Sequence, residues 1–240
     1  MSTADHCHYD HYCADQIKRL DGFYGLIERT LHQELVPHMD GKTILDIGCG
    51  FGSLCDFFNQ LGFDATGIEQ HQVSLDAARE KFPHINFIFD NGTILDTISD
   101  NSFDIVIMKD VIHHVVAEAD SQAFMRNVNR ICKNQVIIID PNPTLILKLA
   151  RKIIRHIDPE CSPKQAIDLL SDNKFRLKRM FFSEVFAFPL SGGYVGPELI
   201  KSPFLMRFIL KIDSFFLKAL NFMKLSRFVC WRYVIVAEKI

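Results

Sequence analysis

Apolar residues recur along this chain with two different periods. Five short runs rich in branched aliphatic and aromatic residues are typical of buried strands, and they lie at 43–47, 64–69, 85–89, 103–109 and 135–140. Segments with apolar residues at 3- and 4-residue steps are typical of helices, and they fall near 53–61, 72–81, 120–132 and 144–156. This alternation predicts an α/β fold with a doubly wound, mostly parallel sheet. Such sheets bind ligands at the carboxyl ends of their strands.

The length of 240 residues suits a single domain, in which we distinguish three parts. Helical periodicity over 14–36 predicts an N-terminal helical lid, whose bounds we place at 1–36. The alternating strands and helices make up a core at 37–158, and the C-terminal part covers 159–240.

The C-terminal part has a different rhythm from the core. A short helix is expected at 162–170, with serine and proline as its N-terminal signals. The phenylalanine-rich stretch 175–188 is predicted as a sixth strand, and 231–237 as a seventh. Residues 190–229, between these two strands, are expected to form a helical insertion.

Three glycines follow the first predicted strand. Asp46 lies near the end of that strand, and Gly48, Gly50 and Gly52 come after it at alternate positions. Glycine has no Cβ, so a ligand can approach the backbone here, and the helix expected from Ser53 offers free N–H groups. A dinucleotide-binding loop is spaced G-x-G-x-x-G, and its third glycine would fall on Ser53. The spacing in this chain therefore departs from the dinucleotide pattern.

Residues 43–52 resemble the first motif of the class I S-adenosylmethionine (SAM) dependent methyltransferases. The stretch 103–115, which contains His113-His114, resembles the fourth-strand motif of small-molecule methyltransferases, and is similar to that of ubiquinone-pathway O-methyltransferases. The resemblance covers about residues 40–145. It implies a Rossmann-like sheet of seven strands, with the last two as an antiparallel edge pair. It also implies SAM as the cofactor.

In this family, acidic residues that follow the second and third strands hold the ribose and the adenine of SAM. Glu69 lies 17 residues after Gly52, and a carboxylate there can accept hydrogen bonds from both ribose hydroxyls. Asp90 matches the acid that accepts a hydrogen bond from the adenine amino group. The predicted cofactor-binding residues are Asp46, Gly48, Cys49, Gly50, Gly52, Glu69, Gln70, Asp90, Asn91, Gly92 and Lys109.

His113 and His114 are the predicted catalytic residues. Histidine titrates near neutral pH, so either ring can take the proton of an acceptor hydroxyl, and we expect transfer to oxygen. Asp110, His113 and His114 occupy the positions at which ubiquinone-pathway O-methyltransferases carry an acidic, acidic, His set that resembles a metal site. Asp-x-x-His-His could still bind a divalent ion, but because His113 replaces the middle acid we predict no metal site. The sequence 140–143, Asp-Pro-Asn-Pro, is interpreted as a turn between the fifth strand and the next helix.

Charge is distributed unevenly along the chain. The net charge of −2 combines a sum of −11 over residues 1–143 with +9 over residues 144–240. A basic C-terminal part indicates either an anionic partner or neutralisation of one part by the other within the fold. Seven scattered cysteines and a polar start without an apolar signal region predict a reduced, cytoplasmic protein.

Residues 204–225 form the most unusual segment. Its polar positions follow 4-3-4-3 steps among apolar residues, and too many of them are charged for a membrane span. Three interpretations stay open: packing on the sheet or on a dimer partner, contact with a membrane interface, or a wall for a long apolar acceptor. The polar positions are Arg207, Lys211, Ser214, Lys218 and Asn221.

The combined features predict transfer of a methyl group to a small acceptor that is apolar or lipid-like. We expect peripheral membrane contact through 204–225, no nucleic-acid partner, and a monomer or homodimer. Two other functions remain open: methylation of nucleic acid or protein, and binding of SAM or lipid without catalysis.

Overall fold

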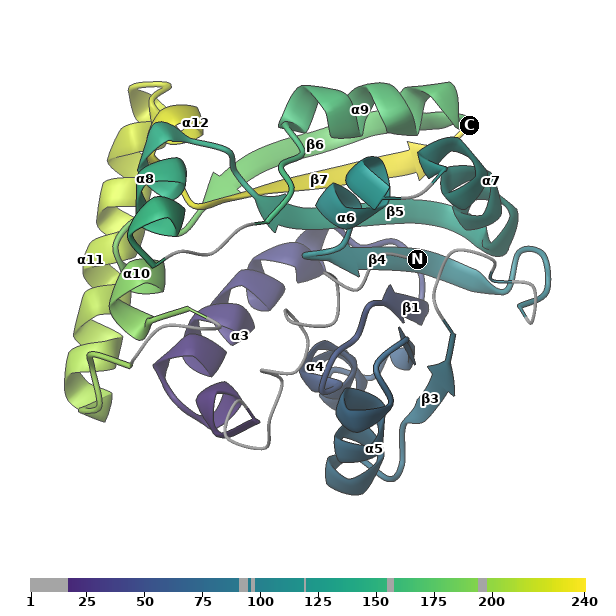
Figure 1. Ribbon diagram of the computed structural model, residues 1–240, viewed down its shortest axis with the longest axis horizontal. Coiled ribbons are helices and arrows are strands. Elements are labelled where there is room, and N and C mark those ends of the chain that lie inside the picture. The colour runs from purple at the N-terminus through teal and green to yellow at the C-terminus, as the bar shows by residue number, and fades with distance from the viewer. Residues whose placement is uncertain (1–16, 91–94, 96–97, 119, 155–157, 194–197) are drawn as a thin grey trace.

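A seven-stranded sheet forms the centre of the computed structural model, which describes residues 17–90, 95, 98–118, 120–154, 158–193 and 198–240 (Figure 1). Each of the seven predicted strands is confirmed. Their bounds are β1 Thr43–Ile47, β2 Asp64–Glu69, β3 Asn86–Phe89, β4 Phe103–Lys109, β5 Cys132–Pro141, β6 Phe175–Ser183 and β7 Arg232–Lys239.

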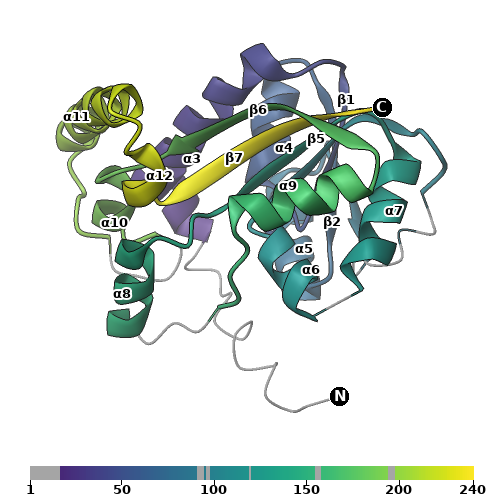
Figure 2. The same ribbon diagram turned by 90° about the horizontal axis from the view of Figure 1, so that it is seen from above.

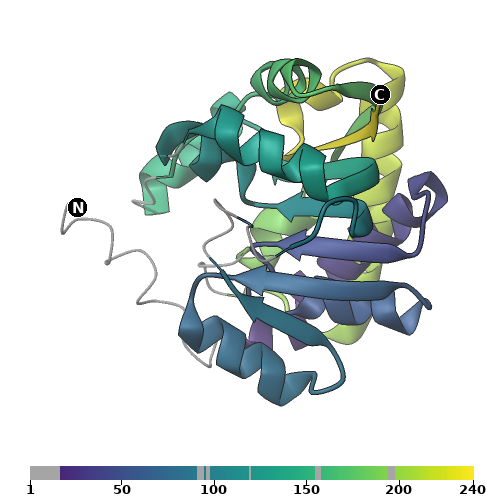
Figure 3. The same cartoon turned by 90° about the vertical axis from the view of Figure 1, so that its right-hand side faces the viewer.

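The strands follow the order β3-β2-β1-β4-β5-β7-β6. The first five pair in parallel, and β7 lies antiparallel between β5 and β6, as its reversed arrow in Figure 1 shows. This arrangement is the class I methyltransferase sheet, and it confirms the expected antiparallel edge pair. In Figure 3 the arrowheads of the blue strands gather at one edge of the sheet, where the candidate site lies.

Helices cover both faces of the sheet, with α3 and α4 on one side and α7 and α9 on the other (Figure 2). The predicted helices of the core are confirmed with small shifts at their ends, whereas α6 and the start of α10 were not predicted. The bounds are η1 Lys18–Asp21, α3 Phe23–Leu35, η2 Val36–His38, α4 Ser53–Gln60, α5 Gln72–Lys81, α6 Ile112–Glu118, α7 Ser121–Ile131, α8 Leu145–Ile154, α9 Pro163–Asp172, α10 Ala187–Ser191, α11 Pro203–Phe222 and α12 Ser226–Val229.

Successive side chains of each strand point to opposite faces, so the sheet divides two hydrophobic cores. Leu45 of β1 packs with residues of α6, α7 and α9. Ile44, one position earlier, packs with residues of α3, α4 and α5. The central strands are therefore buried on both faces, which explains why they read as continuous apolar runs in the sequence.

The prediction of a sixth strand over 175–188 is wrong beyond Ser183. Glu184 has a φ of +66°, a left-handed conformation that a strand cannot continue through. The carboxylate of Asp213 in α11 then accepts hydrogen bonds from the backbone amides of Val185 and Ala187, at 3.2 and 2.8 Å. These contacts satisfy the first backbone amides of the short helix α10, which stands where the last residues of the strand were predicted.

The helices α8, α10, α11 and α12 gather at one end of the molecule, on the left of Figures 1 and 2. The insertion predicted at 190–229 is helical at 203–222 and 226–229. In the part of the chain that the structure describes, no helix combines the length and the apolar character needed to cross a membrane.

Candidate active site

The glycine loop between β1 and α4 is closed by the end of β2. The backbone amides of Gly48 and Cys49 donate to the carbonyl of Ile68 at 2.8 and 2.9 Å. Gly48, Gly50 and Gly52 all have positive φ angles, between 53° and 75°, which side chains rarely adopt. A Cβ built on Gly50 would meet no atom within 4 Å, so the backbone there faces open space.

Glu69 ties this loop to the end of β2. One carboxylate oxygen accepts a hydrogen bond from the Gly50 amide at 2.8 Å, and the other accepts from the amides of Gln70 and His71 at 2.8 and 2.9 Å. Each carboxylate oxygen has two lone pairs, so the oxygen that accepts from Gly50 keeps one acceptor position for a ligand hydroxyl. Glu69 thus both shapes the loop and offers the carboxylate that the sequence predicts for the ribose.

Asp46 lies under the loop and is almost completely buried. Its Oδ2 accepts a weak hydrogen bond from the Cys55 thiol at 3.6 Å, and its Oδ1 has no hydrogen-bond partner among the described residues. Burial raises the pKa of Asp46 to about 7, although the Lys109 ammonium opposes this rise. An incoming cation would restore the ionised form and satisfy Oδ1.

The remaining predicted cofactor residues border the same edge. The amide of Asp90 donates to the Glu69 carbonyl at 3.2 Å, which brings the end of β3 beside the end of β2. Cys49 is buried, whereas the side chain of Gln70 is exposed. Asn91 and Gly92 lie outside the described residues.

Lys109 ends β4, and the structure places its ammonium in a buried ion cluster. Its Nζ donates to Glu28 of α3 and lies 3.8 Å from Asp110. Arg232 of β7 completes the cluster at 3.1 Å from Glu28 and 3.2 Å from Asp110. Burial favours the neutral form of Glu28, but Arg232 and Lys109 outweigh it and lower its pKa to about 2. The cluster therefore fixes helix α3 against the strand ends on which the site is built.

His113 is buried at the start of α6 and is held from behind by Asp140. Its Nδ1 lies 2.7 Å from Asp140 at the end of β5, and the Tyr233 hydroxyl donates to the other oxygen of Asp140 at 3.4 Å. Burial disfavours the charged imidazole, yet hydrogen bonds to Asp140 and Asp158 raise the pKa of His113 to about 10. His113 is therefore positively charged at neutral pH.

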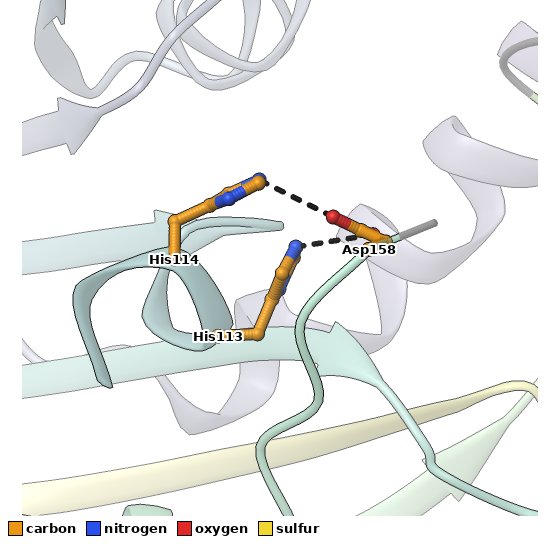
Figure 4. Close-up of side chains that lie close together, drawn as sticks. All are labelled: His113, His114 and Asp158. Carbon is orange, nitrogen blue, oxygen red and sulfur yellow. Dashed lines mark ion pairs between the residues drawn. The ribbon is translucent and has the colours of Figure 1, made fainter. Parts of the chain in front are cut away.

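Asp158 brings the two histidines together. Figure 4 shows both imidazole rings turned toward its carboxylate, with Nε2 of His113 at 3.4 Å and Nε2 of His114 at 3.7 Å. The ring centroids of the two histidines are 4.2 Å apart. Arg151 of α8 binds the same carboxylate at 2.8 Å.

These three side chains could also surround a metal ion, because their ligand atoms all lie within 4.8 Å of one another. Asp110 is not part of this group, and its partners are Lys109 and Arg232 instead. Positive charge on His113 and the guanidinium of Arg151 both oppose a cation at this point. The absence of a metal stays a prediction.

Asp140 and Asp158 are the functional candidates that the sequence interpretation missed. The turn predicted at 140–143 begins later than expected, since β5 continues through Pro141 and the Thr144 amide donates to the Asn142 carbonyl at 2.6 Å just before α8. A buried apolar strand that ends in a carboxylate, as β5 does, was a signal that could have identified Asp140. Asp158 has no comparable local signal.

The described residues fit SAM. The unpaired Oδ1 of Asp46 suits the amino group of the methionine part, and the open backbone at Gly50 leaves room beside it. Glu69 accepts a hydrogen bond from the Gly50 amide and offers its carboxylate to the ribose. Asp46 and Glu69 lie on the adjacent strands β1 and β2, and Gly50 lies in the loop after β1, so one bound molecule can reach all three.

The sequence of this region matches a known family. Residues 45–140 fit the model of the methyltransferase domain. A ubiquinone biosynthesis O-methyltransferase of Glaesserella parasuis is 26% identical over 160 residues, which are 58% of this chain and 67% of that protein. Another, from Rickettsia bellii, is 35% identical over 134 residues, or 50% of this chain and 54% of its own length. The chain thus spans roughly half to two thirds of these relatives.

Solved structures share the fold across most of the chain. A SAM-dependent methyltransferase from Archaeoglobus fulgidus has a TM-score of 0.64 and 19% identity, and the match covers 88% of this chain and 92% of that one. Magnesium protoporphyrin IX methyltransferase from Synechocystis, solved with S-adenosylhomocysteine bound, has a TM-score of 0.63 at 16% identity and covers 97% of both chains. At these identities the likeness supports the fold.

Proposed function

We propose that this chain, which belongs to the class I SAM-dependent methyltransferases, transfers the methyl group of SAM to an oxygen atom of a small apolar or lipid-like acceptor. The observation that carries the choice of oxygen is the histidine pair at the carboxyl end of β4, beside the strand that leads into the glycine loop. Relatives named ubiquinone biosynthesis O-methyltransferases favour the same acceptor atom.

In the cofactor half of the site, the residues of this chain bind SAM and orient its methyl group. SAM supplies an electrophilic methyl group on its sulfonium. Asp46 holds the amino group, Glu69 a ribose hydroxyl, and Asp90 the adenine amino group, while the backbone of Gly48 to Gly52 runs beneath the ligand. Fixing the methyl donor against its acceptor can lower the barrier by ~7–11 kcal/mol.

In the acceptor half, this chain moves a proton. His114 is the more exposed ring, and we assign to it the removal of the proton from the acceptor hydroxyl. His113 keeps its positive charge through Asp140 and Asp158, and this charge stabilises the oxyanion that forms as the proton leaves. Asp140 is a positioning residue, because its contact is with the far side of the His113 ring.

The proposal includes the setting of the reaction. A cytoplasmic enzyme with an apolar acceptor gains from peripheral contact with the membrane through residues 204–225. Twelve of the twenty residues of helix α11 in that segment are exposed. We expect a monomer or a homodimer, and a lid function for residues 1–36, of which the structure describes only 17–36.

Calorimetric titration with SAM and S-adenosylhomocysteine tests the cofactor assignment, on which the rest of the proposal depends. We expect saturable binding of both, and loss of binding when Glu69 is replaced by alanine. Absence of binding at high micromolar ligand would contradict the cofactor assignment. Tight, salt-sensitive binding to polyanions would instead favour methylation of nucleic acid.

A further inference from the structure

Helix α11 lies on the outside of the molecule with a defined inner side. Asp213 is its one buried residue among twenty, all of which the structure describes. The Asp213 carboxylate accepts hydrogen bonds from the amides of Val185 and Ala187, and this contact pins the middle of α11 to the start of α10. The face opposite Asp213 therefore points to solvent.

Four phenylalanines form a stripe on this outer face. They follow one another at steps of 4, 7 and 7 residues. With 3.6 residues per turn, these steps keep the four side chains within about 40° of one another and on the side away from Asp213. The exposed fractions of the four side chains run from 51 to 90%. The stripe consists of Phe204, Phe208, Phe215 and Phe222.

Basic residues run beside the phenylalanine stripe. By the same geometry, Arg207, Lys211 and Lys218 project along one flank of it, and all three are exposed. Residues 199–231 contain six lysines and arginines, and Asp213 is their only acid. Because Asp213 is buried, the exposed charge of this segment is entirely positive.

Helix α8 repeats the same design at the same end of the molecule, as Figure 2 shows. Leu145, Leu149 and Ile153 recur every four residues, and their exposed fractions lie between 60 and 84%. Lys152 projects between them and is exposed as well. On the opposite side of the helix, Arg151 is only 11% exposed and binds Asp158.

We propose that α11, α12 and α8 form one docking surface for an anionic lipid bilayer, and that α8 holds the histidines of the site beside that bilayer. This inference deepens the proposed membrane contact and rests on it. Exposed aromatic and aliphatic stripes with basic flanks are the pattern by which helices lie in a membrane interface. Helix α12, which carries the exposed Phe228, lies near both longer helices in Figure 2.

The positive charge of this docking surface favours an anionic bilayer over a second copy of the chain. A second copy of this chain would bring one positive face against another, and the segment 199–231 offers no exposed acid to neutralise it. Anionic head groups complement the lysines and arginines, while the phenylalanines bury their rings at the acyl boundary.

The position of α8 connects docking to the acceptor. Its outer face carries the leucines, and its inner face reaches His113 and His114 through Arg151 and Asp158. An apolar acceptor that leaves the bilayer next to α8 would therefore have to pass only this helix to reach the histidine pair. Docking would shorten the path of the acceptor from the bilayer to the site and would leave the cofactor half unchanged.

Co-sedimentation of the full chain with lipid vesicles tests this inference. We expect binding to vesicles of phosphatidylcholine with phosphatidylglycerol, weaker binding to phosphatidylcholine alone, and a loss with added salt. Phe215→Glu and Leu149→Glu should each weaken vesicle binding about tenfold or more. Leu61→Glu is the matched control, since Leu61 is an exposed leucine at the end of α4 and should leave binding unchanged.

The same variants separate this inference from the proposed function. Each should keep its melting temperature and its affinity for S-adenosylhomocysteine, because the replaced side chains are exposed and lie outside the cofactor half. Normal vesicle binding by Leu149→Glu with a loss in Phe215→Glu would remove α8 from the surface and overturn the inference, while the proposed contact through α11 would stand. No vesicle binding by the parent chain, with a dimer that Phe215→Glu dissociates, would overturn both.

Discussion

Glu69 in the cofactor half accepts three hydrogen bonds from backbone amides, two of which belong to the next two residues of the chain. His113 in the acceptor half is held instead by side chains from the end of β5 and from the loop after α8. Two of the three contacts of Glu69 thus come from neighbours in sequence, whereas the side chains that hold His113 lie 27 and 45 residues further along the chain. Proteins of one fold can carry different chemistry, because function depends on the side chains that a shared scaffold positions.

Replacing Glu69 by alanine should have the largest effect of the changes considered. It removes the anchor of the Gly50 amide together with the proposed ribose contact, and hydrogen bonds to a charged group contribute ~1.5–3 kcal/mol each. Affinity for S-adenosylhomocysteine should fall at least about a hundredfold in calorimetry. Glu80→Ala, an exposed acid on α5, is the control. A change of less than threefold in Glu69→Ala would remove this residue from the cofactor half.

Replacing His114 by asparagine sharpens the division between the halves. Loss of a proton-accepting group typically lowers kcat by ~10²–10⁴-fold. Affinity for S-adenosylhomocysteine should stay the same, because His114 belongs to the acceptor half. His84→Asn, on an exposed histidine before β3, should alter neither quantity. Equal kcat in His114→Asn and the parent would show that methyl transfer to the acceptor oxygen does not need His114 as a base.

The two halves should also respond differently to pH. Burial raises the pKa of Asp46 to about 7, and the ionised form is the one that binds the amino group of the cofactor. Affinity for S-adenosylhomocysteine should therefore be constant above pH 7 and fall about tenfold per unit below it, where binding must first remove a proton. Asp46→Asn should bind weakly and without this slope. A flat profile in the parent chain would place the amino group elsewhere.

Removal of metal ions should have the smallest effect. His113 is protonated and Asp158 is already paired with Arg151, so this group is poorly suited to hold a cation. Dialysis against EDTA should leave kcat unchanged within error. Loss of activity that magnesium or zinc restores would make His113, His114 and Asp158 a metal site and would end the assignment of His114 as the base.

The difference between the halves also explains what could be predicted from the sequence. The strands and the residues Asp46 and Glu69 follow from short apolar runs and the glycine spacing, which are local features. Asp140 and Asp158 could not be assigned in this way, because their contacts with His113 depend on the packing of β5 and on the path of the chain after α8. Lys109 was expected at the cofactor, and its partner Glu28 lies 81 residues earlier.

The end of β6 is a second feature that depends on a contact distant in the sequence. Phenylalanines up to position 188 continue the pattern of a strand, and nothing within that stretch announces the break at Glu184. The cause is Asp213, which lies 28 residues after Val185 and binds its amide. A local pattern predicted the strand, and a distant carboxylate ended it.

Transfer of an isotope-labelled methyl group tests the central claim most directly. The full chain would be incubated with methyl-¹³C SAM and a membrane lipid extract, and the product analysed by NMR and mass spectrometry. We expect a labelled methyl on oxygen of an apolar product, which His114→Asn reduces strongly and Leu61→Glu does not. Label on nitrogen or carbon, or label confined to protein or nucleic acid, would contradict it.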